Sequence, residues 1–336
     1  MTTISLCMIV KNEAEILERC LDSIADMMDE LIIVDTGSDD NTKQIAARYT
    51  DKIYDFYWID DFAAARNFAF AKATCDYIYS ADADEVLDAK NRRLFGQLKE
   101  DLDGTVEIVQ MYYMNQLEHG SVYNFDRELR PKLFKRQRDF FWVDPIHETV
   151  RLIPVVQNSE IEIIHRPEAS HAARDLRIFE KTIKNGKALS TRLHEMYARE
   201  LFIVGLDEDF IKAAPYFEKA MQENTDLDRI KEAACVVARA ARLAADVPKF
   251  FKFALKDIGS EGCSEMCCEL GEYYRGQGDF YEAIVWFYNA AFETTSILNI
   301  KSSGVIPLLA LADCYEAARL PHEAAEYRKL AGEWSA

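Results

Sequence analysis

The sequence has little glycine and proline, no long apolar run and no excess of basic residues. Of its 336 residues, 13 are glycine and 8 are proline, while 49% are hydrophobic, which excludes collagen-like and disordered proteins. No apolar stretch reaches the roughly 18 residues of a transmembrane helix. The beginning, MTTISLCMIVKNEAE, has no basic region ahead of its apolar stretch, unlike a signal peptide. We therefore expect a globular chain without a membrane span.

Positive charge and paired cysteines are scarce as well. The 58 acidic residues outnumber the 40 basic ones and give a net charge of −18, so most of the surface would repel the phosphates of a nucleic acid. The eight cysteines include no C-x2-C pair that is matched by a second one, which argues against a zinc knuckle and a disulfide framework. These features predict a cytoplasmic protein that binds no nucleic acid.

Apolar and amphipathic runs alternate through the first hundred residues. Strands are predicted at Ile4–Val10, Leu31–Val34, Lys52–Trp58 and Tyr77–Ala81, and helices at Glu13–Met27, Thr42–Tyr49, Phe62–Thr74 and Asp88–Leu102. Strands that alternate with helices predict an α/β fold with a Rossmann-like, mostly parallel sheet covered on both faces. Short strands at Val106–Met114, Leu133–Phe134 and Ile161–His165 are expected to complete this sheet.

The second half of the chain has helical periodicity throughout. One stretch matches the helix pair of the tetratricopeptide (TPR) repeat at Leu270, Gly271, Tyr274, Gly278, Ala283, Phe287 and Ala290. Weaker copies include Leu311 and Ala198. We predict an α/β domain at residues 1–170 and an all-α, TPR-like domain at residues 171–336, for which a generic helical bundle is the alternative.

Acidic side chains follow the predicted strands. Asp35 follows the second strand, Asp61 the third, and Asp82 and Asp84 the fourth. In open α/β sheets, ligands bind at the edge where the carboxyl ends of the strands meet. A helix N-cap role accounts for Asp61. It does not account for the D-x-D pattern of Asp82 and Asp84, whose oxygens suit a hard divalent cation.

No glycine-rich phosphate loop follows the first strand. The phosphates of a substrate would then need a metal at Asp84 and an arginine such as Arg66, and this combination favours a nucleotide-sugar. A nucleotidyltransferase is the nearest enzymatic alternative, but its usual glycine-rich and basic loop is missing. An inert scaffold whose TPR repeats bind a protein is an alternative of another class.

Five motifs, in this order, resemble the family 2 inverting glycosyltransferases, which have the GT-A fold. The motifs lie at Ser5–Glu13, Ile33–Thr42, Phe62–Asn67, Ser80–Glu85 and Ile146–Glu148. The helical half resembles the subgroup with TPR-like tails, which includes S-glycosyltransferases of the sublancin type. The resemblance implies inverting transfer of a hexose or N-acetylhexosamine from a UDP-sugar, with Mn²⁺ or Mg²⁺ as cofactor.

The resemblance also implies roles for individual residues. The donor would be bound by Asn12, Glu13, Asp35, Ser38, Arg66, Asn67 and Asp82. Asp84 and His147 would hold the metal, although His147 could instead satisfy a loop carbonyl, and His165 is the other candidate ligand. Inverting transfer needs a base that takes the proton of the acceptor, and Glu148 is that candidate. The basic stretch Arg127–Arg138, which precedes it, is expected to be mostly a solvated strand face.

The helical repeats suggest the acceptor. They build an extended surface that suits a peptide or protein segment, modified at Ser, Thr or Cys. A cell-envelope glycan is the alternative, but the sequence has no basic amphipathic helix for meeting a lipid-linked acceptor. The helical domain would otherwise serve to form a homodimer.

Overall fold

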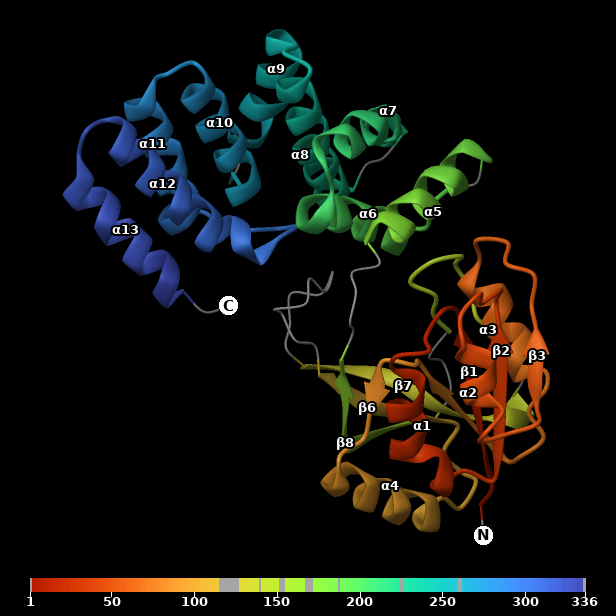
Figure 1. Cartoon of the computed structure of the whole chain (residues 1–336). Coiled ribbons are helices and arrows are strands. Elements are labelled where there is room, and N and C mark those ends of the chain that lie inside the picture. Colours follow the sequence, from red (N-terminus) through yellow and green to blue (C-terminus); the bar gives the residue numbers. More distant parts are fainter. Residues whose placement is uncertain are drawn as a thin grey trace. The chain divides into compact units, whose positions relative to one another are not determined.

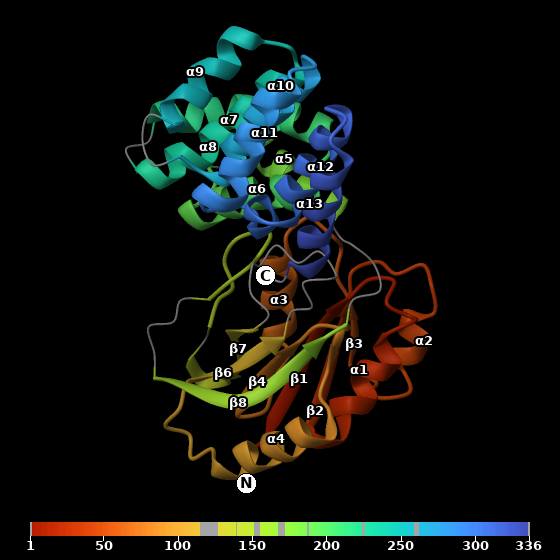
Figure 2. The same ribbon diagram turned by 90° about the vertical axis from the view of Figure 1, so that its left-hand side faces the viewer.

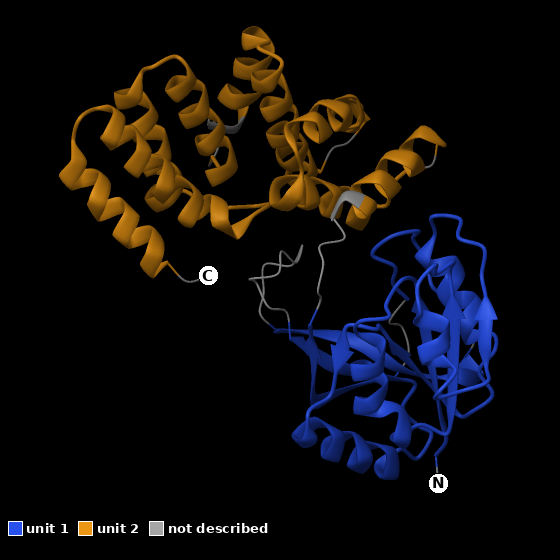
Figure 3. Ribbon diagram, in the orientation of Figure 1, with its two compact units in different colours: residues 1–171 blue, residues 172–336 orange. Residues whose placement is uncertain are grey.

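The chain divides into two units, Met1–His171 (unit 1) and Ala172–Ala336 (unit 2), shown in Figure 3. This computed structural model describes residues 2–114, 127–138, 140–150, 155–166, 172–186, 188–223, 226–258 and 262–334. The domain boundary predicted after residue 170 falls outside the described residues. Within the described part of the chain, no helix is long and apolar enough to cross a membrane.

Unit 1 is built on a mixed sheet that has eight strands in the described residues (Figure 1). The strands are β1 (Ile4–Val10), β2 (Glu30–Asp35), β3 (Ile53–Asp55), β4 (Tyr77–Ala81), β5 (Glu85–Val86), β6 (Ile108–Met114), β7 (Arg127–Lys135) and β8 (Val156–His165). Their order is β3-β2-β1-β4-β7-β6-β8-β5. The first four pair in parallel, but β7 runs antiparallel to both β4 and β6, so the sheet is less parallel than expected.

Helices cover both faces of this sheet, as the buried strands require. They are α1 (Leu17–Ile24), α2 (Thr42–Ala46), α3 (Phe62–Phe70) and α4 (Ala89–Asp101). Successive side chains of a strand point to opposite faces. Leu6 and Met8 of β1 accordingly belong to the apolar core with α1 and α4, whereas Cys7 belongs to the core with α3. The predicted α/β class is confirmed.

Several predicted elements are shorter in the structure, among them the helices predicted at Thr42–Tyr49 and Phe62–Thr74, which end at Ala46 and Phe70. The helix predicted at Glu13–Met27 and the strand predicted at Lys52–Trp58 are shorter as well. The helix predicted from Glu13 begins at Leu17, because the Glu13 N–H donates to the side chain of Thr42, the first residue of α2, and the Ala14 N–H donates to Asp40 in the loop before it. The strand predicted at Lys52–Trp58 pairs with β2 only over Ile53–Asp55, at the edge of the sheet. In both cases a loop that carries polar side chains replaces the end of the element.

Unit 2 is all-α in its described residues, as predicted. Its helices are α5 (Ala172–Lys184), α6 (Thr191–Val204), α7 (Asp207–Glu223), α8 (Leu227–Leu243), α9 (Val247–Ile258), α10 (Ser264–Gly276), α11 (Phe280–Tyr288), α12 (Val305–Ala317) and α13 (Pro321–Glu333). The predicted TPR pair is α10 and α11, which pack side by side (Figure 2). A Cβ at Gly271 would lie 2.7 Å from the ring of Phe287, so glycine allows these two helices to approach.

Candidate active site

Asp35 is the last residue of β2, and only one of its two carboxylate oxygens accepts hydrogen bonds from the described residues. Its Oδ1 accepts hydrogen bonds from the N–H groups of Gly37 and Ser38, both at 3.0 Å. Gly37 has a φ of 103°, which a residue with a side chain rarely adopts. Oδ2 is buried and has no hydrogen-bond partner among the described residues. Because buried polar atoms are normally paired, this oxygen is suited to a donor group on a ligand.

The loop after β1 is joined to the loop after β2. The Asn12 N–H donates to the Ser38 Oγ at 2.9 Å, and the Asn12 Oδ1 accepts from the Asp39 N–H at 2.9 Å. The Glu13 N–H donates to the Thr42 Oγ1 at 2.8 Å. The structure therefore brings Asn12, Glu13 and Ser38 together at the end of the sheet, where these hydrogen bonds fix the shape of the loops.

Arg66 of α3 binds two other segments of unit 1, the end of β4 and the segment that contains Glu148. Its Nη2 donates to the Asp82 Oδ1 at 2.7 Å, its Nη1 donates to the Ser80 Oγ at 3.0 Å, and its Nε donates to the Glu148 Oε1. The guanidinium also lies over the ring of Trp142, 5.0 Å from its centroid. Burial lowers the pKa of Arg66, but the carboxylates of Asp82 and Glu148 outweigh burial and raise it. Arg66 is thus a buried, permanent cation between two predicted site residues.

Asp82 and Glu148, the two carboxylates bound to Arg66, can each still interact with a ligand. Burial raises the pKa of Asp82, but the charges of Arg66 and Lys132 outweigh it and hold that pKa well below its usual range. The Asp82 side chain is 36% exposed, so it is open to solvent or a ligand. Glu148 uses Oε1 for Arg66, whereas its Oε2 has no donor among the described residues. This oxygen is placed to take a proton.

Asn67 and His147 position the chain around Glu148. The Asn67 side chain donates to the Trp142 carbonyl oxygen at 3.0 Å and accepts from the Trp142 N–H at 2.8 Å. Both polar atoms of this predicted donor-binding residue therefore tether a neighbouring segment. His147 has a φ of 46°, a strained backbone conformation immediately before Glu148.

The D-x-D segment meets a histidine that is distant in the sequence. Strand β5 pairs with the end of β8 and sets Glu85 opposite His165. As a result, the His165 Nε2 lies 2.9 Å from the Asp84 Oδ2, and the Asp84 carbonyl oxygen accepts from the Arg166 N–H at 2.8 Å. Asp84 Oδ1 is buried and has no hydrogen-bond partner among the described residues.

This pair of side chains fits a divalent metal in part. A carboxylate oxygen and an imidazole nitrogen are ligands that Mn²⁺ accepts. No cluster of three or more His, Cys, Asp or Glu side chains suited to a metal occurs in the described ranges. A metal at Asp84 and His165 would therefore need further ligands from a substrate or from water.

A buried ion pair, which the sequence analysis did not predict, lies next to the D-x-D segment. The Lys132 Nζ lies 2.7 Å from the Glu85 Oε1, and both side chains are buried. Burial raises the pKa of Glu85 to about 7 despite the nearby charge of Lys132. The basic stretch Arg127–Arg138 was expected to be mostly solvated, yet Lys132 points inward. Its place directly before the apolar pair Leu133–Phe134 was the available signal.

Comparison with known proteins agrees with the fold and the motifs. Residues 5–153 match the family described as Glycosyl transferase family 2. Unit 1 is a family 2 glycosyltransferase domain. With its mixed sheet, this domain has the GT-A fold, as expected from the motifs, and it is followed by the TPR-like helices of unit 2.

Two relatives are each named for one of these two features. A TPR repeat-containing protein of Synechococcus elongatus is 41% identical over 152 residues, which cover 45% of this chain and 36% of that protein. The SPbeta prophage-derived glycosyltransferase SunS of Bacillus subtilis is 35% identical over 92 residues, which cover 27% of this chain and 22% of SunS. The chain thus covers well under half of the length of either relative.

Among solved structures, glucosyl-3-phosphoglycerate synthase from Mycobacterium tuberculosis, in complex with Mn²⁺, UDP and phosphoglyceric acid, is similar with a TM-score of 0.41. It is 16% identical, and the match covers 56% of this chain and 80% of that one.

Proposed function

We propose that the glycosyltransferase domain moves a hexose or N-acetylhexosamine from a UDP-sugar to a Ser, Thr or Cys side chain of a polypeptide, with inversion and with the help of a divalent metal. The observation that carries this proposal is the contact between Asp84 of the D-x-D segment and His165, beside a buried Asp84 oxygen that has no hydrogen-bond partner in the described residues. The family match supports the transfer of a glycosyl group.

The donor would lie across the carboxyl ends of β1, β2 and β4. The free Oδ2 of Asp35 would accept a hydrogen bond from the base, within the loops that Asn12, Glu13 and Ser38 shape. The exposed side of Asp82 would accept a hydrogen bond from the ribose. Carboxylates are acceptors only, so these positions select hydroxyl and N–H groups and would repel a bare phosphate.

The diphosphate would be bound through the metal. Asp84 and His165 would hold that ion, with His147 as the other predicted ligand, and the ion would neutralise the charge that builds up on the departing diphosphate. Arg66 is engaged by two carboxylates in this structure, so it supports the site by orienting Glu148 and Asp82.

Glu148 would be the general base. The acceptor oxygen or sulfur attacks the anomeric carbon from the face opposite the diphosphate, the bond from that carbon to the diphosphate oxygen breaks, and the acceptor proton moves to the Oε2 of Glu148. Arg66 holds Oε1 and so keeps the base in one orientation. A base fixed by a third group is typical of an activated nucleophile.

The helical unit supports a polypeptide acceptor. Tandem helix pairs present extended surfaces that suit chain segments. The resemblance to S-glycosyltransferases of the sublancin type supports the same choice, and a cytoplasmic location is consistent with free, reduced cysteines.

The test is calorimetric titration of Mn²⁺ into the protein in the presence and absence of UDP. We expect Asp84→Asn and His165→Ala to abolish UDP-dependent Mn²⁺ binding, whereas Asp51→Asn, which alters an exposed carboxylate of the same unit, leaves it unchanged. His147→Ala decides whether that residue is a further ligand. Binding of UDP that is equally strong with and without Mn²⁺ would contradict the proposed metal role.

A further inference from the structure

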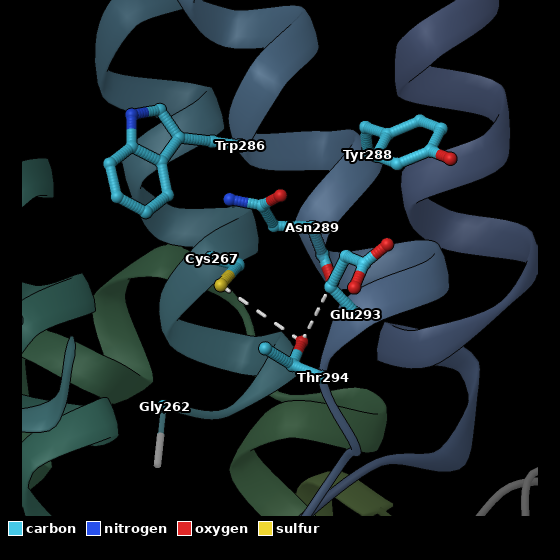
Figure 4. Close-up of a pocket in the computed structure, with 7 residues that line it drawn as sticks. All are labelled: Gly262, Cys267, Trp286, Tyr288, Asn289, Glu293 and Thr294. Atoms are coloured by element: carbon cyan, nitrogen blue, oxygen red, sulfur yellow. Dashed lines mark hydrogen bonds between the residues drawn. The ribbon is translucent and has the colours of Figure 1, made fainter. Parts of the chain in front are cut away.

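A cavity of about 450 Å³ opens in unit 2 at the end of α11 (Figure 4). Its volume lies in the range of small-ligand sites. The α-helix continues here into a π-helical turn, Asn289–Glu293, which is a rare conformation that is frequent at functional sites. No step of the proposed transfer uses this cavity.

One polar side chain of the cavity lining, Thr294, has hydrogen-bond partners, whereas two others have none among the described residues. The Thr294 hydroxyl lies 3.0 Å from the Asn289 carbonyl oxygen, 2.9 Å from the Ser264 hydroxyl and 4.0 Å from the Cys267 Sγ. In contrast, the Asn289 carboxamide and the Glu293 carboxylate form no hydrogen bond or ion pair with any residue in the described part of the chain. These two side chains are available to a ligand.

Two aromatic side chains line the same cavity. The Trp286 Nε1–H donates to the Glu282 Oε1 at 3.1 Å, which holds the indole in place. Figure 4 shows Trp286 and Tyr288 on either side of Asn289. The residues that line the cavity include no Lys, Arg or His. Aromatic faces beside a carboxylate without a partner attract a cation, whereas a phosphate or a carboxylate would be repelled.

An apolar stripe leads away from the cavity along α11. Tyr281, Val285 and Tyr288 are spaced at i, i+4 and i+7, so they share one helix face, and they are 68%, 49% and 42% exposed. Phe292 extends the stripe, with its ring centroid 4.8 Å from that of Tyr288. Tyr288 belongs to both the cavity and the stripe. Contiguous exposed apolar side chains of this kind mark an interaction surface.

We propose that the cavity and the stripe bind a segment of the polypeptide acceptor, with a Lys or Arg side chain in the cavity against Glu293 and apolar side chains on the stripe. This inference rests on the proposed polypeptide acceptor. Charge complementarity favours this occupant, because the chain has a net charge of −18 and the cavity contains a carboxylate and no cation. A second copy of the same acidic chain would bring like charge to the surface.

The test selects peptides on the full-length protein. A phage library of random dodecapeptides is panned on the wild type, on Glu293→Lys and on Glu326→Lys, a control that changes an exposed carboxylate on α13. We expect the wild type and the control to enrich Lys or Arg next to Leu, Ile or Phe, and Glu293→Lys to lose that enrichment. Replacing the basic residue of the best peptide by Gln should weaken binding about tenfold, measured by fluorescence anisotropy.

Recovery of peptides without basic residues, or equal recovery on Glu293→Lys, would overturn the proposal. So would a dimer in analytical ultracentrifugation that Tyr288→Ser dissociates while no basic peptide is selected, because the stripe would then bind a second copy. UDP-sugar hydrolysis by the wild type is measured separately. If no UDP-sugar is hydrolysed, the proposed function fails, whichever peptides are selected.

Discussion

Replacing Arg66 by leucine should destabilise unit 1 strongly, because it leaves two carboxylates without their shared cation. Removing one partner of a buried ion pair costs about 3–5 kcal/mol. The Glu148 side chain is only 12% exposed, but Asp82 is 36% exposed and keeps part of its hydration. We therefore expect a loss of unfolding free energy at the lower end of this range, about 3 kcal/mol. This loss corresponds to a fall of about 6–12 °C in the melting temperature of a unit of this size.

The loss should also depend on pH. Arg66 lowers the pKa of Asp82 in the folded protein, so the stability from this group is present above the pKa of the unfolded state and is lost as the pH falls through the folded pKa. Without Arg66, burial favours the protonated form of the Asp82 carboxyl group and raises its pKa. The difference between wild type and Arg66→Leu should be largest near neutral pH and shrink as the pH falls towards 4, where carboxyls become protonated.

Differential scanning calorimetry of the full chain, at several pH values, measures both effects. The matched control is Arg48→Leu, which breaks the ion pair with Glu18 at 2.6 Å, where both side chains are more than half exposed. Such a surface pair contributes less than about 1 kcal/mol. An equal fall in melting temperature for Arg66→Leu and Arg48→Leu, or an effect of Arg66→Leu that does not change with pH, would contradict a stabilising role for the buried Arg66 cation.

Three further predictions concern single side chains. Asp84→Ala should abolish metal-dependent UDP-sugar hydrolysis without lowering the melting temperature, because it removes one carboxylate from an acidic cluster; a cooperative loss of fold would contradict this. Gly271→Ala places a Cβ 2.7 Å from the Phe287 ring and should lower the unfolding free energy, measured with denaturant, by about 1–3 kcal/mol. Gly276→Ala, whose Cβ would have nothing within 4 Å, should not lower it. Equal denaturation midpoints for the two variants would contradict the close approach of α10 and α11. Burial raises the pKa of Glu200 from 4.5 to about 8, so its stabilising contribution is present below pH 4.5 and lost as the pH rises through 8. The melting temperature of Glu200→Gln relative to that of the wild type should therefore rise as the pH increases from 4.5 to 8 and stay constant above 8, and a difference that does not change over this range would contradict the prediction.

Much of the fold could be predicted because local patterns determine it. The strands Ile4–Val10 and Tyr77–Ala81 have the bounds expected from their apolar runs, and the glycine of the TPR pair lies against the ring that its spacing implied. The antiparallel insertion of β7 could not be predicted, because it depends on the pairing of Ile78 with Phe134 across a long separation.

The site was predictable only as far as its motifs. Asp84 and Glu148 stand in short patterns whose chemistry can be read locally. The approach of His165 to Asp84 depends on the register between β5 and β8, which no local pattern reports. Arg66 was expected beside the diphosphate, but the structure gives it two carboxylate partners, because burial of a guanidinium requires compensating charge.

Metal-dependent transfer from a UDP-sugar at Asp84 can be tested by measuring UDP release from a panel of UDP-sugars with Mn²⁺ and with EDTA. We expect that the wild type releases UDP from at least one UDP-sugar, that EDTA stops the reaction, and that Asp84→Ala is inactive under the same conditions. Release of UDP at equal rates with EDTA, or by Asp84→Ala, would contradict it, as would no release from any member of the panel.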